Sequence, residues 1–229
     1  PKHGTVDALP NWARKTLRDH EGDERPALPD WETLARGQSG DDLWDLAQRS
    51  LAAHGVLHDN VRQTWAKALL KWTPNLQAAL DLALDLNNRF ALDGRDPNSY
   101  QGVLWSFGLF DHAHQPEREI LGTVRSRDTA WQSTMIDMPS YRRLVTRSPV
   151  EAPPTVAVIG AGLAGLSCAR VLQDHGLSPV IYEQGLEAGG RLLTGHNQGC
   201  SFDMGAQHVM VRDERTRPWV EAWRARGLV

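Results

Sequence analysis

The stretch TVAVIGAGLAGLSCARVLQDHGLSPVIYE, residues 155–183, indicates a strand, a glycine-rich turn, a helix and a second strand in succession. TVAVI is a short apolar run rich in β-branched residues, which suits a strand buried on both faces. The helix should follow the glycines and end at Gly176, and SPVIYE reads as the next strand. This order predicts a βαβ unit with two parallel strands, which is an α/β fold.

The three glycines of the turn, Gly160, Gly162 and Gly165, form the pattern GxGxxG of a Rossmann-type nucleotide site. Gly160 allows the tight turn, Gly162 lets the backbone approach a pyrophosphate, and Gly165 lets the helix pack closely on the strand. Glu183 ends the second strand, where a carboxylate can accept both ribose hydroxyls. Because a carboxylate repels a 2′-phosphate, the motif favours FAD or NAD over NADP.

The composition is that of a globular chain of 229 residues, 41% hydrophobic and 23% charged, which allows two domains. No apolar run reaches the roughly 18 residues of a membrane span, so we expect no membrane partner. The net charge of −3 gives no indication of nucleic-acid binding. Only Cys168 and Cys200 are cysteines, which predicts a reducing, cytoplasmic setting. The chain lacks an initiating Met and ends soon after the nucleotide unit begins, so we expect a piece of a longer protein.

The residues before the nucleotide unit have helical periodicity. Apolar positions recur at helical spacing in residues 41–55, 57–72 and 75–91. Asp41 or Asp42 suits the N-cap of the first of these helices, and Gly55 suits its end. The proline-containing stretch 146–155 has no such period and reads as a linker. We therefore expect an all-α domain over 1–147, a linker over 148–154 and an α/β domain over 155–229.

The sequence after Glu183 sharpens the nucleotide prediction. EQGLEAGGRLLT, residues 183–194, and FDMGAQHVMVRD, residues 202–213, resemble the flavin oxidoreductases of the amine-oxidase and renalase-like group. The resemblance covers residues 155–229 and implies a small amine or nucleotide-like substrate of unknown identity. It also implies FAD contacts at Gly160, Gly162, Gly165, Glu183, Gly190 and Arg191, and less directly at Asp203, Gly205 and Gln207.

The helical part has a second resemblance. It rests on LHDNVRQTWAKALLKWT (57–73), LDLNNRFALDGRDPNSYQGVLWSFG (84–108) and EREILGTVR (117–125). These segments resemble the carboxy-terminal, FAD-binding half of the DNA photolyase and cryptochrome family, closest to the class II cyclobutane pyrimidine dimer type. The resemblance spans about residues 9–145 and implies UV-damaged DNA as a partner.

Three tryptophans carry the photochemical part of this resemblance. Trp65 and Trp72 are seven residues apart, so on one helix they would share a face, and Trp44 lies on the preceding expected helix. The resemblance maps all three onto the chain that carries electrons to the flavin, with Trp65 nearest to it. The alternative is that they are core aromatics, since Trp is often buried.

Polar residues of the same region correspond to flavin contacts of the family. The resemblance makes Arg62 and Asp93 an ion pair beside the isoalloxazine ring and places Asn87 near flavin N5. It places Asp96 and Asn98 along the flavin, although turn chemistry alone also explains these two residues. The chain departs from the family at one position facing the DNA lesion, where Gln63 stands in place of the usual Met.

His112 and His114, in the segment DHAH, could suggest a metal. No further ligands have suitable spacing, so we expect a solvated loop and no metal site.

These features predict part of a fused flavoprotein with one or two FAD sites. The first function class is light-driven electron transfer to damaged DNA by the helical part. The second is a dark, FAD-dependent oxidation by the Rossmann part. In the third, the helical part is only a docking or regulatory domain beside a dark oxidoreductase.

Overall fold

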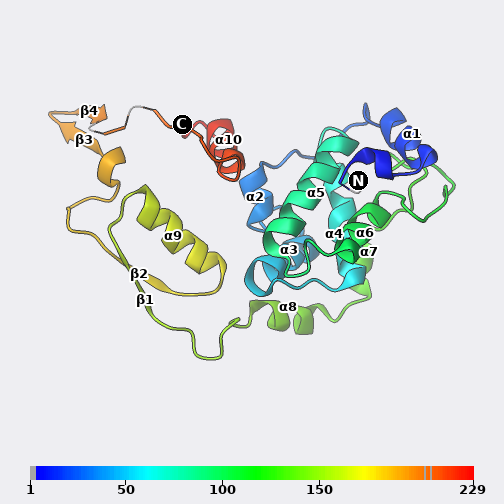
Figure 1. The fold of residues 1–229 in the computed structure, drawn as a ribbon, viewed down its shortest axis with the longest axis horizontal. Helices are drawn as coiled ribbons and strands as arrows, with labels where there is room; N and C mark the ends of the chain where they lie inside the picture. The colour runs from blue at the N-terminus through cyan, green and yellow to red at the C-terminus, as the bar shows by residue number, and fades with distance from the viewer. Residues whose placement is uncertain (1–3, 204, 207) are drawn as a thin grey trace. The chain divides into compact units, whose positions relative to one another are not determined.

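The computed structural model describes residues 4–203, 205–206 and 208–229. The chain divides into two compact units, Pro1–Val145 and Thr146–Val229 (Figure 1). In the described residues, the first unit is built from helices, and the second combines two small sheets with two helices. The predicted fold class, a helical part followed by an α/β part, is confirmed. Among the described helices, none is both long and apolar enough to cross a bilayer.

From residue 4 onward, the helical unit contains a first 3₁₀ turn and then eight successive α-helices, the last of which ends at the boundary between the units. Their bounds are Val6–Ala8 for the 3₁₀ turn, then α1 Asn11–Asp19, α2 Trp31–Ala35, α3 Asp42–His54, α4 Asp59–Ala68, α5 Leu76–Phe90, α6 Pro97–Ser106, α7 Thr129–Thr134 and α8 Met138–Thr146.

Local signals in the sequence explain where these helices start and stop. The Asp41 side chain accepts the backbone N–H of Trp44 at 3.0 Å and caps α3. Gly55 ends α3 in the left-handed conformation, with φ of 67°. Asn75 caps α5 by accepting the N–H of Ala78. The expected N-cap and stop of the first periodic segment are therefore confirmed.

The second periodic segment differs from the single helix expected over residues 57–72. The α-helix α4 ends at Ala68, and a 3₁₀ turn, Leu69–Lys71, precedes Trp72. Pro74 disfavours helical backbone at Thr73, so the helix tightens and stops before it. Trp72 therefore leaves the face of α4.

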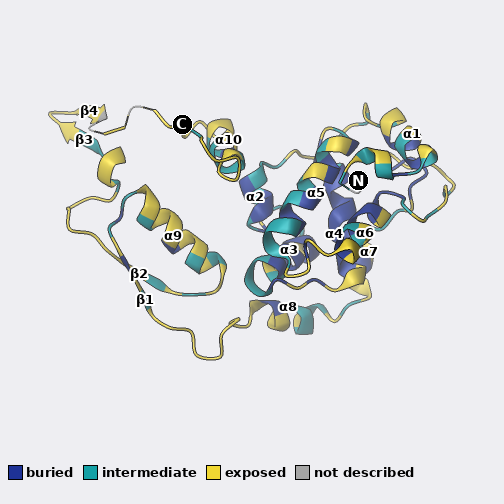
Figure 2. Cartoon of the chain, in the orientation of Figure 1, coloured by how far each residue is buried: buried dark blue, intermediate teal, exposed yellow. Residues whose placement is uncertain are grey.

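One hydrophobic core runs through the helical unit (Figure 2). α4 packs against α3, α6 and α7, and α5 packs against α6. The largest fully buried side chains include Trp44, Trp65 and Phe107. The segments that carry the photolyase-like motifs are therefore the centre of this unit.

The second unit contains the predicted βαβ arrangement. β1, Val156–Ile159, pairs in parallel with β2, Pro179–Tyr182, and α9, Leu163–Asp174, connects them. A 3₁₀ turn, Gly190–Leu192, leads to the antiparallel pair β3 and β4, and α10 follows. The bounds of these last elements are β3 Thr194–Asn197, β4 Cys200–Asp203 and α10 Arg217–Ala225.

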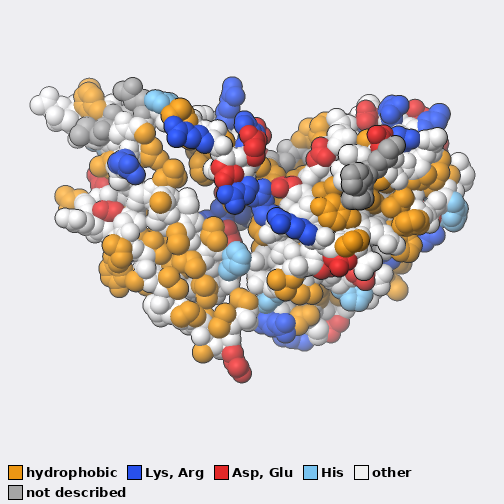
Figure 3. Space-filling model, viewed as in Figure 1, with side chains coloured by type: hydrophobic (Ala, Val, Ile, Leu, Met, Phe, Trp, Pro, Cys, Tyr) orange, Lys and Arg blue, Asp and Glu red, His pale blue; other side chains and the backbone are white. Residues whose placement is uncertain are grey.

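The strands of this unit are less buried than the sequence suggested. Val158 is buried, but Ile159 is 80% exposed and Val180 is 44% exposed. A parallel sheet buries both faces only when further strands and helices cover it, and β1 and β2 form a two-stranded sheet. The expectation of a strand buried on both faces is therefore wrong for this chain. Figure 3 shows apolar side chains gathered over α9 on the viewed face of the unit.

Candidate functional site

Three tryptophans form a continuous chain of ring contacts inside the helical unit, hereafter called the stack. The rings of Trp44 and Trp65 have centroids 6.1 Å apart and planes within 9° of parallel. Trp72 meets Trp44 edge-on, with centroids 5.1 Å apart. Trp44 and Trp65 are buried, whereas Trp72 is partly exposed. The structure thus brings together the three residues singled out in the sequence, with Trp44 in the middle.

Hydrogen bonds fix the orientation of the two buried indoles. Trp44 Nε1 donates to the backbone oxygen of Trp65 at 2.9 Å. Trp65 Nε1 donates to Oε1 of Gln48 at 3.1 Å, and Gln48 Nε2 donates to the backbone oxygen of Ala35. Sequence reasoning missed Gln48, although its position four residues after Trp44 on α3 puts it on the same helix face. The three tryptophans also belong to or pack against the hydrophobic core, so they contribute to packing whether or not they carry electrons.

A polar network begins one turn before Trp65 on α4. Arg62, only 4% exposed, donates from Nη2 to both carboxylate oxygens of Asp93 at 2.9 and 2.8 Å. Its Nη1 donates to Oγ of Ser99 at 2.6 Å. Asn87, on α5 and fully buried, donates to the same Oγ at 2.8 Å. Ser99, which the sequence did not single out, therefore joins the expected ion pair to the expected asparagine.

Two buried atoms of this network lack a hydrogen-bond partner, namely Asn87 Oδ1 and Arg62 Nε. The Asn87 amide orientation follows from its contacts, because its Nδ2 faces the backbone oxygen of Gly94, which can only accept. An unpaired buried polar atom costs about 1–3 kcal/mol. Of these two residues, Arg62 lines the neighbouring cavity, whereas Asn87 is fully buried and does not line it.

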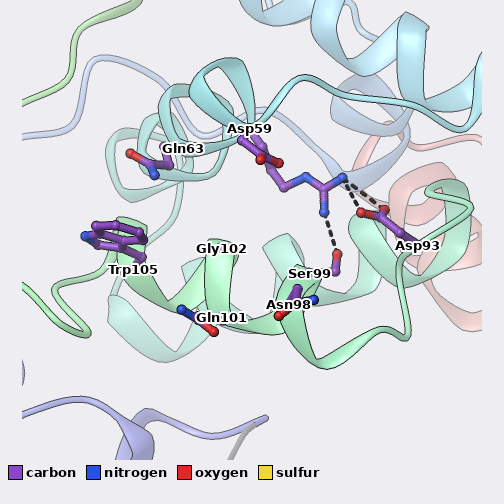
Figure 4. Close-up of a pocket in the computed structure, with 9 residues that line it drawn as sticks. Asp59, Gln63, Asp93, Asn98, Ser99, Gln101, Gly102 and Trp105 are labelled. Atoms are coloured by element: carbon purple, nitrogen blue, oxygen red, sulfur yellow. Dashed lines mark hydrogen bonds and ion pairs between the residues drawn. The ribbon is translucent and has the colours of Figure 1, made fainter.

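A cavity of about 210 Å³ opens beside this network (Figure 4). Gln63 and Trp105 lie toward one end of the view, and Asp93 and Ser99 lie toward the other. The lining residues are Asp59, Arg62, Gln63, Asp93, Asn98, Ser99, Gln101, Gly102 and Trp105. Most residues that line the cavity are therefore polar, and one indole, that of Trp105, is among them.

The two turn residues have different positions. Asn98 lines the cavity. Asp96 is not among the lining residues; its side chain caps α6 by accepting the N–H of Asn98 at 2.8 Å. Turn and capping chemistry thus accounts for Asp96 in this structure.

A buried cation lies farther along α4. Lys67 is 5% exposed and donates from Nζ to the backbone oxygen of Arg125. Burial lowers the pKa of Lys67 to about 8, while the charge of Asp111 partly opposes this shift. Nearby, Arg127 donates from Nη1 to Oε1 of Gln63, which ties the cavity wall to the segment before α7.

In the second unit, the glycine loop has the geometry that its motif requires. Gly160 follows β1 with φ of 95°, and its N–H donates to the backbone oxygen of Tyr182 at 2.7 Å. A Cβ on Gly165 would lie 1.8 Å from the backbone oxygen of Gly160. No side chain fits there, so Gly165 permits the close approach of α9 to the loop.

The glycine pair after β2 folds back onto this loop. The N–H of Gly189 donates to the backbone oxygen of Ala161 at 2.8 Å, and a Cβ on Gly190 would lie 3.1 Å from Cα of Gly162. Arg191 follows on the 3₁₀ turn and is exposed. The expected cofactor residues of the two motifs therefore meet in one place.

The weaker candidates lie in and after β4. The backbone of Asp203 ends β4, and Gly205 packs so closely on Arg191 that a Cβ would lie 1.7 Å from its backbone oxygen. Gln207 lies outside the described residues.

Glu183 lies at the edge of the glycine loop. One carboxylate oxygen accepts the N–H of Gly185 at 2.8 Å, and the other accepts the N–H of Ala161 at 2.6 Å. These two N–H groups lower the pKa of Glu183 below its ordinary value, so the group is ionised at neutral pH. Each oxygen has further lone pairs, and the residue is exposed, so it can still accept from a ligand.

The two units are similar to different known proteins. Residues 158–223 match the family model described as an NAD(P)-binding Rossmann-like domain. A deoxyribodipyrimidine photo-lyase of Oryza sativa is 36% identical over 148 residues, which is 64% of this chain and 29% of the relative. The photo-lyase of Methanothermobacter thermautotrophicus is 41% identical over 123 residues, 54% of this chain and 27% of the relative. Polyamine oxidase 4 of Oryza sativa is 40% identical over 71 residues, 30% of this chain and 15% of the relative.

Matches of 123 and 148 residues are longer than the whole stretch after the linker, so they include the helical unit. The chain spans less than a third of the length of these photo-lyases. Sequence similarity therefore confirms both resemblances, to photo-lyases in the helical unit and to amine oxidases in the Rossmann unit. The chain therefore joins a segment homologous to deoxyribodipyrimidine photo-lyases to a Rossmann-like unit with homologues among the amine oxidases.

Proposed function

We propose that the helical unit is part of an FAD site at which light drives electrons through Trp72, Trp44 and Trp65. The observation that carries this proposal is the stack itself, whose buried end lies one turn of α4 from Arg62. Arg62 lines the cavity at that end, which supports a ligand beside its guanidinium. Core packing alone explains buried tryptophans but not a polar cavity that begins one turn of α4 away from them.

Each residue has a defined task in this proposal. FAD, when bound, would supply the light absorption and the redox chemistry. Trp72 is the partly exposed end where an external reductant restores the electron, and Trp44 passes it to Trp65. Arg62 supplies a fixed positive charge that favours a negatively charged ring, and Asp93 holds its guanidinium in place. The Asn87 amide can both donate and accept, so it suits a position whose protonation changes.

Photoreduction of the full-length protein tests this proposal. Purified protein with FAD is exposed to blue light and an external reductant, and the loss of oxidised-flavin absorption is followed. Trp65→Phe should slow the conversion by more than about tenfold, because phenylalanine is much harder to oxidise. Trp131→Phe is the matched control, since Trp131 is 54% exposed on α7 and outside the stack. Equal photoreduction rates in the two variants would show that the three tryptophans serve only to pack the core.

We further propose UV-damaged DNA as the partner of the helical unit. The similarity to deoxyribodipyrimidine photo-lyases supports it, as does a cavity lined by Gln63 and Trp105. Dimer repair is best assayed on chemically reduced protein, so that photoreduction and repair are measured separately. Gln63→Met should repair at least as well as the parent. If neither form repairs dimers while both photoreduce, the DNA part of the proposal fails and electron transfer stands.

The Rossmann unit supports a second function, a dark FAD-dependent oxidation of a small amine. Its support is that the glycine loop, the GGR segment and the ionised Glu183 lie close together, and that the unit is similar to a polyamine oxidase. Glu183→Ala should weaken FAD binding by at least roughly tenfold. The flavin content decides how many sites exist: two FAD per chain supports both functions, and one FAD that is lost in Glu183→Ala leaves the helical unit a docking or regulatory domain.

We place the boundary between the two functions in a linker over residues 148–154, with the photolyase-like part over 1–147 and the Rossmann part over 155–229. We also propose a reducing, cytoplasmic setting, because Cys168 and Cys200 are both free and exposed. Limited proteolysis should cut within 148–154, and cell fractionation should find the protein in the cytoplasm.

A further inference from the structure

A loop of the helical unit brings three metal-ligating side chains together after α6. Nδ1 of His112 lies 3.4 Å from Oδ1 of Asp111, and Nε2 of His114 lies 3.1 Å from the same oxygen. One ligand atom from each residue lies within 4.8 Å of the others. Among the side chains that the structure describes, no other group of three His, Cys, Asp or Glu residues is placed in this way.

The distances match those inside a metal site. A tetrahedral Zn²⁺ ion with bonds of about 2.0–2.1 Å holds its nitrogen and oxygen ligands about 3.3–3.4 Å from one another. The two separations from Asp111 Oδ1, 3.4 Å to His112 and 3.1 Å to His114, are close to this value. Two imidazoles and one carboxylate suit a borderline first-row cation, whereas Mg²⁺ and Ca²⁺ prefer oxygen ligands.

Nε2 of His114 faces two groups that it cannot satisfy together. The carboxylate of Asp111, 3.1 Å away, only accepts, and Nε of Arg125, 3.3 Å away, only donates. A protonated Nε2 is a donor that meets the donor Nε of Arg125. An unprotonated Nε2 is an acceptor that meets the acceptor carboxylate of Asp111. A cation shared by the nitrogen lone pair and the carboxylate removes the second conflict. Arg125 can then turn outward, because its side chain is 59% exposed.

We propose that Asp111, His112 and His114 bind one Zn²⁺ ion, with the remaining coordination position open to water. The histidine spacing alone gave two ligands, and the fold supplies the third because Oδ1 of Asp111 lies within 3.4 Å of a nitrogen of each ring. The backbone N–H of His114 donates to the oxygen of Thr123, whose own N–H donates to Oγ1 of Thr16. The ion would therefore secure this loop against α1.

Zinc titration of the full-length protein, without an affinity tag and after removal of metals by a chelator, tests the proposal. Calorimetry should show that His112→Ala loses at least about tenfold in Zn²⁺ affinity, since even indirect partners of a ligand are worth 10–100-fold. His112 is the variant of choice because its side chain is 77% exposed, so the fold should survive. The control is His208→Ala, an exposed histidine of the second unit.

Arg125→Gln should raise Zn²⁺ affinity, because it removes a positive charge 3.7 Å from the Asp111 carboxylate. Zn²⁺ should also raise the thermal unfolding midpoint of the parent but not of His112→Ala. Equal Zn²⁺ binding in the parent and His112→Ala would overturn the site, as would no Zn²⁺ binding above that of Mg²⁺. A lower affinity in Arg125→Gln would overturn the assigned geometry.

Discussion

The indole of Trp44 stacks on that of Trp65, with centroids 6.1 Å apart and planes within 9° of parallel, and its Nε1 donates to the Trp65 backbone oxygen. These two rings come from different helices, α3 and α4. Because Trp72 contacts Trp44 as well, Trp44 connects the other two rings. The order of the proposed electron path follows from this arrangement.

The middle position of Trp44 makes it as important to photoreduction as Trp65. Trp44→Phe should slow photoreduction of the full-length protein by more than about tenfold, because the path loses its central ring. The variant also loses a buried hydrogen bond, so its free energy of unfolding should fall by about 1–2 kcal/mol. A Trp44→Phe variant that photoreduces at the rate of Trp131→Phe would contradict the path.

Gln48 should matter to stability more than its polar nature suggests. Gln48→Leu leaves the Trp65 Nε1–H and the Ala35 oxygen buried without their partner, which should cost about 2–4 kcal/mol in free energy of unfolding. Urea unfolding of the parent and the variant measures this difference. Gln77→Leu is the control, because the hydrogen bond of Gln77 to Asp81 on α5 is exposed. The network is misassigned if the two variants are equally stable.

Arg62 should control the flavin potential through its charge. Arg62→Gln removes a positive charge held against Asp93 and Ser99, so the bound flavin should become harder to reduce and its midpoint potential should fall. Arg62→Lys should shift the potential less, because the charge remains. Spectroelectrochemical titration measures the three potentials. Arg49→Gln, which removes an exposed positive charge on α3, should leave the potential unchanged.

Substitutions of two glycines in the Rossmann loop should have different effects, one on stability and the other on FAD binding. Gly165→Ala puts a Cβ 1.8 Å from the Gly160 oxygen, so the loop must distort and the unfolding temperature of this unit should fall. Gly162→Ala meets no atom closer than 3.9 Å, so it should fold normally yet bind FAD poorly, because the Cβ blocks the pyrophosphate. Calorimetric unfolding and FAD titration distinguish the two effects. Normal FAD binding by Gly162→Ala would reject the site.

Lys67 should make the free energy of unfolding of the helical unit depend on pH in the alkaline range. Its pKa is about 8 when folded, against 10.5 for an unperturbed lysine, because burial disfavours the charge. Between these values the unfolded chain binds a proton that the folded chain does not, so the Lys67 contribution to the free energy of unfolding rises with pH from about 8 to 10.5. Below pH 8 the contribution is constant and unfavourable.

Urea unfolding across this pH range measures the effect. Lys67→Met should remove the rise and be more stable than the parent below pH 8. Lys71→Met is the control, since the Lys71 side chain is 37% exposed and paired with Asp128. The same slope in the parent and in Lys67→Met would show that another group causes the pH dependence.

The sequence alone determined the two-part fold. Periodicity, N-caps and the stop at Gly55 are local signals, because they depend on residues within a turn or two of each other. The glycine loop is equally local: a positive φ at Gly160 and the absence of a side chain at Gly165 follow from the turn itself. For the same reason the two resemblances could be read directly from contiguous segments.

The tertiary structure alone decided how distant residues meet. The place of Trp44 between Trp65 and Trp72 depends on how α3 packs on α4 and on where Pro74 ends the helix. Ser99 joins Arg62 to Asn87 only because α6 packs against both α4 and α5. Sequence spacing does not specify packing between helices, since the crossing of two apolar faces sets which side chains touch. Packing between the helices therefore determined which distant side chains touch, and local sequence patterns could not predict these contacts.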